Sequence, residues 1–404
     1  MTIELHATTP QGRRLVVLAE QLAEQLAGDA GRHDKDASYP FDGLAAVSRS
    51  GYLAAAVPAE LGGLGVTSVL DLVVAASRLA RGDASLAIGV NMHTDFALGV
   101  SRAHRAAAAA GRAERASTFA AILRWLVSDA AVVAAAVSEH GQDLTRPETT
   151  AERVEQGWRI SGRKVFCTMS PAATTLLTAV RFAGREGEER YGYALVPASS
   201  PGVRIENDWD ALGMRSSGSH SITFEGVEVP ETALLGGFRV GDAVAYVERN
   251  LTAGLFHASA SLGIAESAVA VVRPRLSQRR DVDARSRMLL AEIAVDLAAA
   301  RATLARAAGL VDEHDALATR NGGRSALVDI FAEVQAAKAF VNETATAVVD
   351  RALALSGGGG YLNGSALARA YRDVRAGAFM HPLGANRAYD VLADVALERP
   401  VTLR

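Results

Sequence analysis

The chain has 404 residues, of which 49% are hydrophobic and 22% charged, a composition typical of a globular protein with two or three packed layers or domains. A net charge of −3 gives no electrostatic reason to bind nucleic acid, and the single cysteine, Cys167, excludes an internal disulfide framework and a cysteine-based zinc site. We find no signal-peptide pattern, and the alanine-rich runs are shorter than the roughly 20 apolar residues that span a bilayer. We therefore expect a cytoplasmic protein without transmembrane helices.

The predicted elements fall into three successive segments. In residues 1–130 the apolar residues recur at helical spacing, which predicts a helical domain. In residues 131–238 short alternating segments rich in β-branched residues, punctuated by glycines, predict a compact β-domain. In residues 239–404 helical spacing returns, with residues 286–313 and 325–355 as the longest expected helices. This order predicts an α+β protein that is mainly α.

Seven short motifs carry the strongest signal in the chain. They are Val57-Pro58 with Gly62-Gly63-Leu64-Gly65, Ser138-Glu139, residues 162–166, Leu212-Gly213-Met214-Arg215, residues 224–230, Leu262-Gly263-Ile264-Ala265, and residues 357–361 with Arg372-Asp373. Each motif alone is weak. Together and in this order, they make the chain similar to the acyl-CoA dehydrogenase superfamily over nearly its whole length.

The resemblance implies a fold and a cofactor. The fold would consist of an N-terminal helical domain (1–130), a middle β-barrel domain (131–238) and a C-terminal four-helix bundle (239–404), in a homodimer or homotetramer. A flavin would lie between the β-domain and the bundle. The expected cofactor contacts are Ser138, Phe166, Cys167, Thr168, Arg215, Gly358 and Gly359. The hydroxyl groups of Ser138 and Thr168 could instead cap β-turns, so both interpretations stay open.

The chain departs from the dehydrogenases where they place their catalytic base. Removal of a substrate α-proton needs a well-placed carboxylate, which the family supplies from one of two positions. Here the first position is His381, and the second, ten residues before Gly263, is Ala253. Glu248 lies five residues from the second position and faces another side of the helix. Residues 276–282 also lack the Phe-Gly pair with which dehydrogenases bind the FAD of a neighbouring subunit.

Both departures, and the Trp209-Asp210 pair before Leu212, resemble the two-component flavin-dependent monooxygenases of the superfamily. These include dibenzothiophene monooxygenase, aromatic hydroxylases and N-hydroxylases of amino sugars and amines. The resemblance implies reduced FMN or FAD delivered by a separate flavin reductase, and oxygenation of a small organic substrate by O2. Two alternatives stay open: an FAD-dependent acyl-CoA or acyl-carrier dehydrogenase, and a non-catalytic partner subunit with the same fold.

Histidines are the candidates for acid–base chemistry. Histidine is the side chain whose ordinary pKa lies nearest neutral pH, so His381 could act as acid, base or partner of the oxygenated flavin. Alternatively, His381 could cap the helix before Pro382. His257 is the second catalytic candidate. His93 either borders the substrate cavity or is a satisfied core histidine. We find no spacing of ligands that indicates a metal site.

Overall fold

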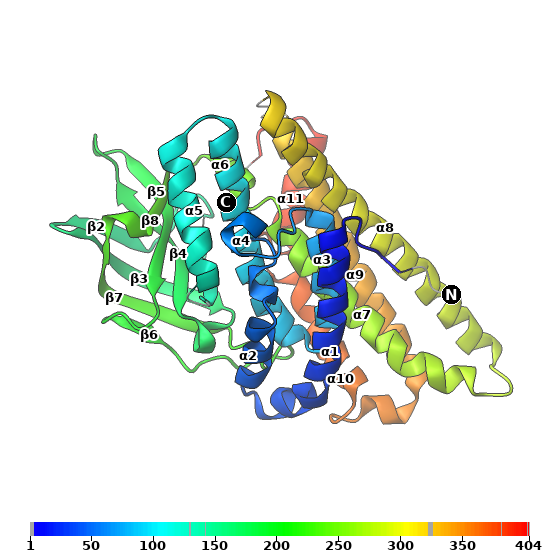
Figure 1. Cartoon of the computed structure of the whole chain (residues 1–404). Helices are drawn as coiled ribbons and strands as arrows, with labels where there is room; N and C mark the ends of the chain where they lie inside the picture. Colours follow the sequence, from blue (N-terminus) through cyan, green and yellow to red (C-terminus); the bar gives the residue numbers. More distant parts are fainter. Residues whose placement is uncertain are drawn as a thin grey trace.

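The computed structural model describes residues 4–128, 131–141, 143–321, 326–380, 382–401 and 403. Strands gather on one side of the molecule and helices fill the rest (Figure 1). The N-terminal helices are α1 (Pro10–Asp36), α2 (Phe41–Arg49), α3 (Val69–Ala80), α4 (Ala84–Ala109) and α5 (Ala113–Ser128). Their placement matches the helical segment predicted from apolar periodicity.

Helix α4 forms one wall of the cavity described below. It begins at a local signal, because the Asp83 side chain accepts a hydrogen bond from the Leu86 backbone N–H (3.1 Å) and satisfies a donor that the first helical turn leaves free. Most of its first four turns are buried against α3, α5 and α7. The chain direction of α4 is therefore fixed by its cap and by packing on three sides.

The middle segment forms one eight-stranded sheet in the order β6-β7-β3-β2-β4-β5-β8, with β1 paired parallel to β4. The strands are β1 (Val133–Ala136), β2 (Thr150–Val154), β3 (Gly157–Cys167), β4 (Thr175–Ala183), β5 (Glu189–Pro197), β6 (Val203–Ile205), β7 (His220–Pro230) and β8 (Leu234–Arg239). Apolar side chains, such as Trp158 and Ile160 at alternate positions of β3, form a core separate from that of the helices. The pairing path runs from β6 to β8, and β1 branches from it at β4.

The C-terminal segment returns to helices: α6 (Ala243–Arg249), α7 (Ala253–Ser277), α8 (Ala284–Asn321), α9 (Leu327–Ser356), α10 (Ala366–Asp373) and α11 (Ala385–Ala396). Helices α8 and α9 correspond to the two longest helices predicted from the sequence. Helix α7 packs against α9, α3, α4 and α8, so the N- and C-terminal helices share one core. This result confirms the predicted class, α+β and mainly α.

Helix α7 is the one element in the described part of the chain that is long and apolar enough to cross a membrane. However, 78% of its most apolar window is buried inside the fold. A helix that is apolar all round is expected at the centre of a large protein core as well as in a membrane. The burial of α7 identifies it as the central core helix.

Candidate active site

A cavity of about 1540 Å³ lies where the N-terminal helices, the sheet and the C-terminal helices meet. Its walls come from α4, α6, α7, the cavity-facing ends of β1, β3, β5 and β8, the loop before β7, and the short helix η6 (Val374–Ala378). Cavities that hold one small ligand typically measure about 300–1,000 Å³. This cavity therefore has room for a cofactor and a second molecule.

The sheet contributes a wall that combines an aromatic surface with hydroxyl groups. Phe166, at the end of β3, is 62% exposed and packs edge-on against Trp209, with 6.0 Å between the ring centres. Next to this pair, the hydroxyl of Thr168 lies 2.9 Å from that of Ser219, which lies 2.7 Å from that of Ser217. Ser138 lines the same wall.

The backbone of this wall is strained. Phe166 and Met214 have φ angles of 55° and 51°, in the left-handed region that residues other than glycine seldom occupy. Such strain persists only where the surrounding structure enforces it, and it concentrates at functional sites. Here it turns the Phe166 ring out of the sheet core and into the cavity.

The sheet wall fits a flavin. An isoalloxazine ring needs a flat apolar surface and hydrogen-bonding groups at fixed positions around its pyrimidine edge. Phe166 and Trp209, whose rings meet edge to face, offer apolar aromatic contact, and Ser138, Thr168 and Ser219 offer the hydroxyls. These residues would hold the ring, and the flavin would supply the redox chemistry of the site.

Four residues expected to contact the cofactor do not line the cavity. Cys167 is fully buried in the sheet core, because the pairing of β3 with β7 shifts register between Lys164 and Cys167, where Phe166 has a left-handed backbone. Burial raises the pKa of this thiol to about 12. Arg215 donates hydrogen bonds to the carbonyls of Asp34 and Ala211. Gly358 and Gly359 are exposed in the short helix η5 (Gly358–Tyr361), away from the cavity.

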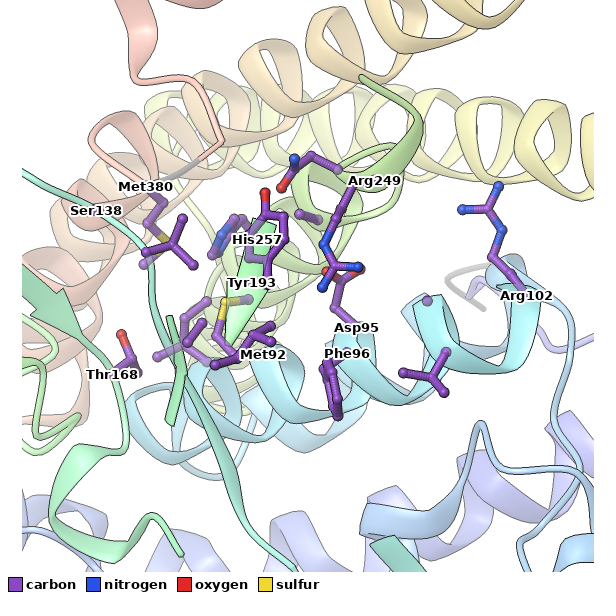
Figure 2. A pocket seen from close by; sticks show the side chains of 18 of the residues that line it. Met92, Asp95, Phe96, Arg102, Ser138, Thr168, Tyr193, Arg249, His257 and Met380 are labelled. Carbon is purple, nitrogen blue, oxygen red and sulfur yellow. The ribbon is translucent and has the colours of Figure 1, made fainter. Parts of the chain in front are cut away.

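The opposite wall is one face of α4 (Figure 2). Ile88, Met92, Asp95, Gly99 and Arg102 follow each other at helical spacing and all line the cavity. Asp95 interrupts this apolar stripe with a carboxylate, whose Oδ1 accepts a hydrogen bond from the Thr252 hydroxyl (2.6 Å). Burial raises the pKa of Asp95 to about 6, although Thr252, Arg102 and Arg249 favour its charged form. No sequence motif indicated Asp95 as a site residue.

His93 lies on the other side of α4 and is a core residue. Its Nδ1 accepts a hydrogen bond from the Val133 backbone N–H (3.1 Å), so its Nε2 carries the proton and donates to the Leu53 carbonyl (3.1 Å). Burial lowers the pKa of His93 to about 4. Of the two roles left open for this residue, the structure supports the satisfied core histidine.

Helices α6 and α7 supply the third wall. His257 of α7 lines the cavity and lies one helical turn after Ala253, which also lines it. Ala253 occupies one of the two positions where dehydrogenases carry their base, and it offers no carboxylate. Arg249 of α6 stacks over the Tyr193 ring, 4.0 Å from its centre, and its side chain reaches toward Asp95 in Figure 2.

The segment that carries the first catalytic candidate is held by α9. His381 itself lies outside the described residues, but Phe379 and Met380 before it line the cavity. The buried Lys338 of α9 donates through Nζ to the carbonyls of Met380 (2.5 Å) and Leu383 (2.6 Å). Asn342, one turn along α9, donates to the Gly377 carbonyl (2.8 Å). These bonds fix the backbone of Gly377, Met380 and Leu383 at the edge of the cavity.

Replacing Lys338 with Met is expected to loosen this edge. Methionine keeps an unbranched apolar stem but removes the donor, so two buried carbonyls lose their partner at a cost of about 1–3 kcal/mol. We expect a lower unfolding free energy and faster amide hydrogen exchange in η6 and at Met380, measured by mass spectrometry. Glu333→Gln, which affects an exposed α9 residue paired with Arg306, is the control. Unchanged amide exchange in η6 would contradict the role of Lys338 in fixing the cavity edge.

Comparisons with known proteins agree with this site. Models of the N-terminal, middle and C-terminal domains of acyl-CoA dehydrogenases match residues 15–107, 133–227 and 241–394. The amino sugar nitrososynthase DnmZ of Streptomyces peucetius is 33% identical over 403 residues, covering 97% of this chain and 95% of DnmZ. The putative acyl-CoA dehydrogenase YdbM of Bacillus subtilis is 27% identical over 389 residues, covering 94% and 96%.

A solved structure connects the fold with a cofactor. KijD3 in complex with FMN and dTDP-3-amino-2,3,6-trideoxy-4-keto-3-methyl-D-glucose matches with a TM-score of 0.89 and 32% identity, covering 99% of this chain and 97% of KijD3. This match and the fit of the sheet wall confirm the predicted flavin. The similarity to the nitrososynthase DnmZ likewise places the chain with the oxygenating branch of the superfamily. The chain therefore belongs to the acyl-CoA dehydrogenase family and is a flavin-dependent oxidoreductase.

Proposed function

We propose that this enzyme is a monooxygenase that adds one oxygen atom of O2 to the amino group of a sugar joined to a nucleoside diphosphate, using reduced FMN from a separate reductase. The observation that carries the proposal is the cavity, which exceeds the needs of one ligand and joins a flavin-fitting wall to an arginine-rich mouth. The identities support it, at 33% to the nitrososynthase DnmZ and 27% to the dehydrogenase YdbM.

The mouth of the cavity suits a diphosphate. Its lining includes the arginines and aspartates at the junction of α4, α5 and α8: Arg102, Arg105, Arg112, Arg115, Asp312 and Asp315. Asp315 binds Arg102 through both carboxylate oxygens (2.6 and 2.7 Å), and Asp312 accepts hydrogen bonds from the first turn of α3. Arginine is the side chain best suited to phosphate oxygens, and the remaining guanidinium groups leave an excess of positive charge.

The proposed reaction balances in atoms and electrons with reduced flavin, O2 and the substrate amine as reactants. When bound, reduced flavin and O2 supply one oxygen atom to the amine nitrogen, the other oxygen leaves as water, and the flavin ends oxidised. The product is the hydroxylamine. The chain would bind the sugar nucleotide, orient its nitrogen and exclude water. Dehydrogenation would instead need a base at one of the two positions where the family carries a carboxylate, and these are His381 and Ala253 in this chain.

The proposal is tested with dTDP-3-amino-2,3,6-trideoxy-4-keto-3-methyl-D-glucose, the ligand of the KijD3 structure, as substrate. The enzyme is incubated with FMN, a flavin reductase, NADH and isotopically labelled O2, and the sugar nucleotide is analysed by mass spectrometry. We expect one labelled oxygen in the product. If no oxygen enters an amino sugar nucleotide, but acyl-CoA bleaches enzyme-bound FAD without O2, the dehydrogenase alternative replaces the proposal.

A further inference from the structure

Asp95 differs from the other acidic side chains that line the described cavity. These other side chains are Asp210, Glu248, Asp312 and Asp315. Asp315 is bound by Arg102, and Asp312 caps α3. The Asp210 side chain is 94% exposed, and Glu248 is exposed at the rim. Asp95 is thus the acid that faces the interior of the cavity without an ion pair in the described part of the chain.

The surroundings of Asp95 leave one carboxylate oxygen available to a ligand. Thr252 donates to Oδ1 (2.6 Å), and no described residue donates to Oδ2. Met92 and Phe96 flank Asp95 on the cavity face of α4 and give the carboxylate apolar neighbours on its own helix (Figure 2). Arg249 also approaches from α6, but its guanidinium stacks on Tyr193 and forms no ion pair with Asp95 among the described residues.

An acid in this setting meets a need of the proposed reaction. A sugar amine is protonated at neutral pH, and an ammonium nitrogen has no electron pair with which to take up oxygen. A carboxylate in apolar surroundings binds an ammonium group by a charge-assisted hydrogen bond and can then accept its proton. The cavity therefore needs one acid that is free of a permanent cation.

Resting on the proposed function, we propose that Asp95 binds the ammonium group of the substrate and accepts one of its protons at Oδ2. An N–H bond breaks and an O–H bond forms, so the ammonium and carboxylate become a neutral amine and a carboxylic acid. No oxidant takes part in this step. The pKa of Asp95, raised by burial to about 6, brings the acid closer to an amine in proton affinity.

The first test is binding of two ligands to Asp95→Asn, which keeps the shape of the side chain. The probes are dTDP and dTDP-3-amino-2,3,6-trideoxy-4-keto-3-methyl-D-glucose, measured by calorimetry on the FMN-loaded enzyme. Loss of a charge-assisted hydrogen bond is expected to weaken the amino sugar nucleotide about tenfold or more and to leave dTDP within about twofold. Glu248→Gln, which changes a carboxylate at the rim of the same cavity, is expected to leave the ratio of the two affinities unchanged.

The second test is the pH dependence of oxygenation. Arg102 on α4, Arg249 on α6, Tyr193 on β5 and His257 on α7 are the charged or titratable groups around Asp95. The wild-type kcat/KM is expected to fall as the pH drops through about 6, where Asp95 becomes protonated. Asp95→Asn should lose this acid limb. Thr252→Val removes a hydrogen bond that favours the carboxylate, so it should move the limb to higher pH.

The outcomes separate the two proposals. If the wild-type enzyme oxygenates the amino sugar nucleotide while Asp95→Asn binds it equally well, the role of Asp95 is overturned and the proposed function stands. If the wild-type enzyme oxygenates no amine, the proposed function fails by itself. Should Asp95→Asn fail to bind FMN, the Thr252→Val profile decides, because an acid limb unmoved by that change would exclude Asp95 as the titrating group.

Discussion

Glu266→Gln is expected to destabilise the fold by about 3–5 kcal/mol, because it removes the buried carboxylate that three arginines share. The Glu266 side chain is only 4% exposed in α7. Its Oε1 accepts from Arg301 of α8 (2.8 Å), and its Oε2 accepts from Arg81 (2.6 Å) and Arg78 (3.3 Å) at the end of α3. Glutamine can accept hydrogen bonds, but it cannot balance three guanidinium charges.

An exposed carboxylate on the same cluster provides the control. Glu20 of α1 pairs with Arg78 Nε at 3.2 Å, but the Glu20 side chain is 48% exposed. Solvent screens such a pair, so Glu20→Gln is expected to cost at most about 1 kcal/mol. Urea unfolding followed by tryptophan fluorescence measures both variants. Equal losses in the two variants would show that the charge of Glu266 does not hold α3, α7 and α8 together.

Helix periodicity predicted the fold well because long helices leave strong signals. The observed α9 lies within two residues of the helix expected at residues 325–355, and α8 begins two residues before the helix expected at residues 286–313 and extends eight residues beyond it. The partners of Glu266 were not predictable in the same way. Glu266 stands in an apolar run of α7, and Arg78 and Arg81 lie 188 and 185 residues earlier in the chain, so only the packing of α3 on α7 brings them together.

The candidate site was predictable in part. Strict alternation from Trp158 and Ile160 would place Phe166 in the sheet core and Cys167 on the other face. The observed reversal depends on the register shift between Lys164 and Cys167, which the sequence pattern does not indicate. Asp95 and His93 are two residues apart on α4 and therefore face different sides. Deciding which side meets the cavity requires the packing of α4 against α7 and the sheet. The sequence signal for a functional residue on α4 was the charged Asp95 among Ile88, Met92 and Gly99.

Glu139→Gln is expected to have a comparable effect on the sheet and to reach the flavin wall. The Lys164 ammonium, fully buried in β3, lies 2.6 Å from Glu139 Oε1. The same carboxylate accepts hydrogen bonds from the backbone N–H groups of Glu148 (2.6 Å) and Thr149 (2.9 Å). Removing one charge of a buried pair typically costs about 3–5 kcal/mol. Ser138 directly precedes Glu139, and its backbone carbonyl accepts a hydrogen bond from the Val165 backbone N–H (2.9 Å). Because a change at Glu139 would disturb Ser138, we also expect weaker FMN binding.

The pair should also make stability depend on pH in a predictable direction. Burial alone would raise the pKa of Glu139, but the Lys164 ammonium and the hydrogen bonds to the carboxylate hold it below the usual value. A lowered carboxyl pKa stabilises the fold above about pH 4 and ceases to do so as the pH falls through the folded-state pKa. The gap in unfolding free energy between wild type and Glu139→Gln is therefore expected to be full at pH 7 and to shrink in acid.

The matched control is an exposed ion pair whose cation also lies on β3. Arg159 of β3 pairs with Glu228 of β7 at 2.8 Å, but their side chains are 48% and 62% exposed. Glu228→Gln changes the same chemical group in a screened pair and is expected to cost at most about 1 kcal/mol, with unchanged FMN affinity. Urea titrations at pH 7 and pH 4, together with FMN fluorescence titrations, compare the two variants. If Glu139→Gln bound FMN like wild type despite the lost stability, the buried pair would support the sheet without positioning Ser138.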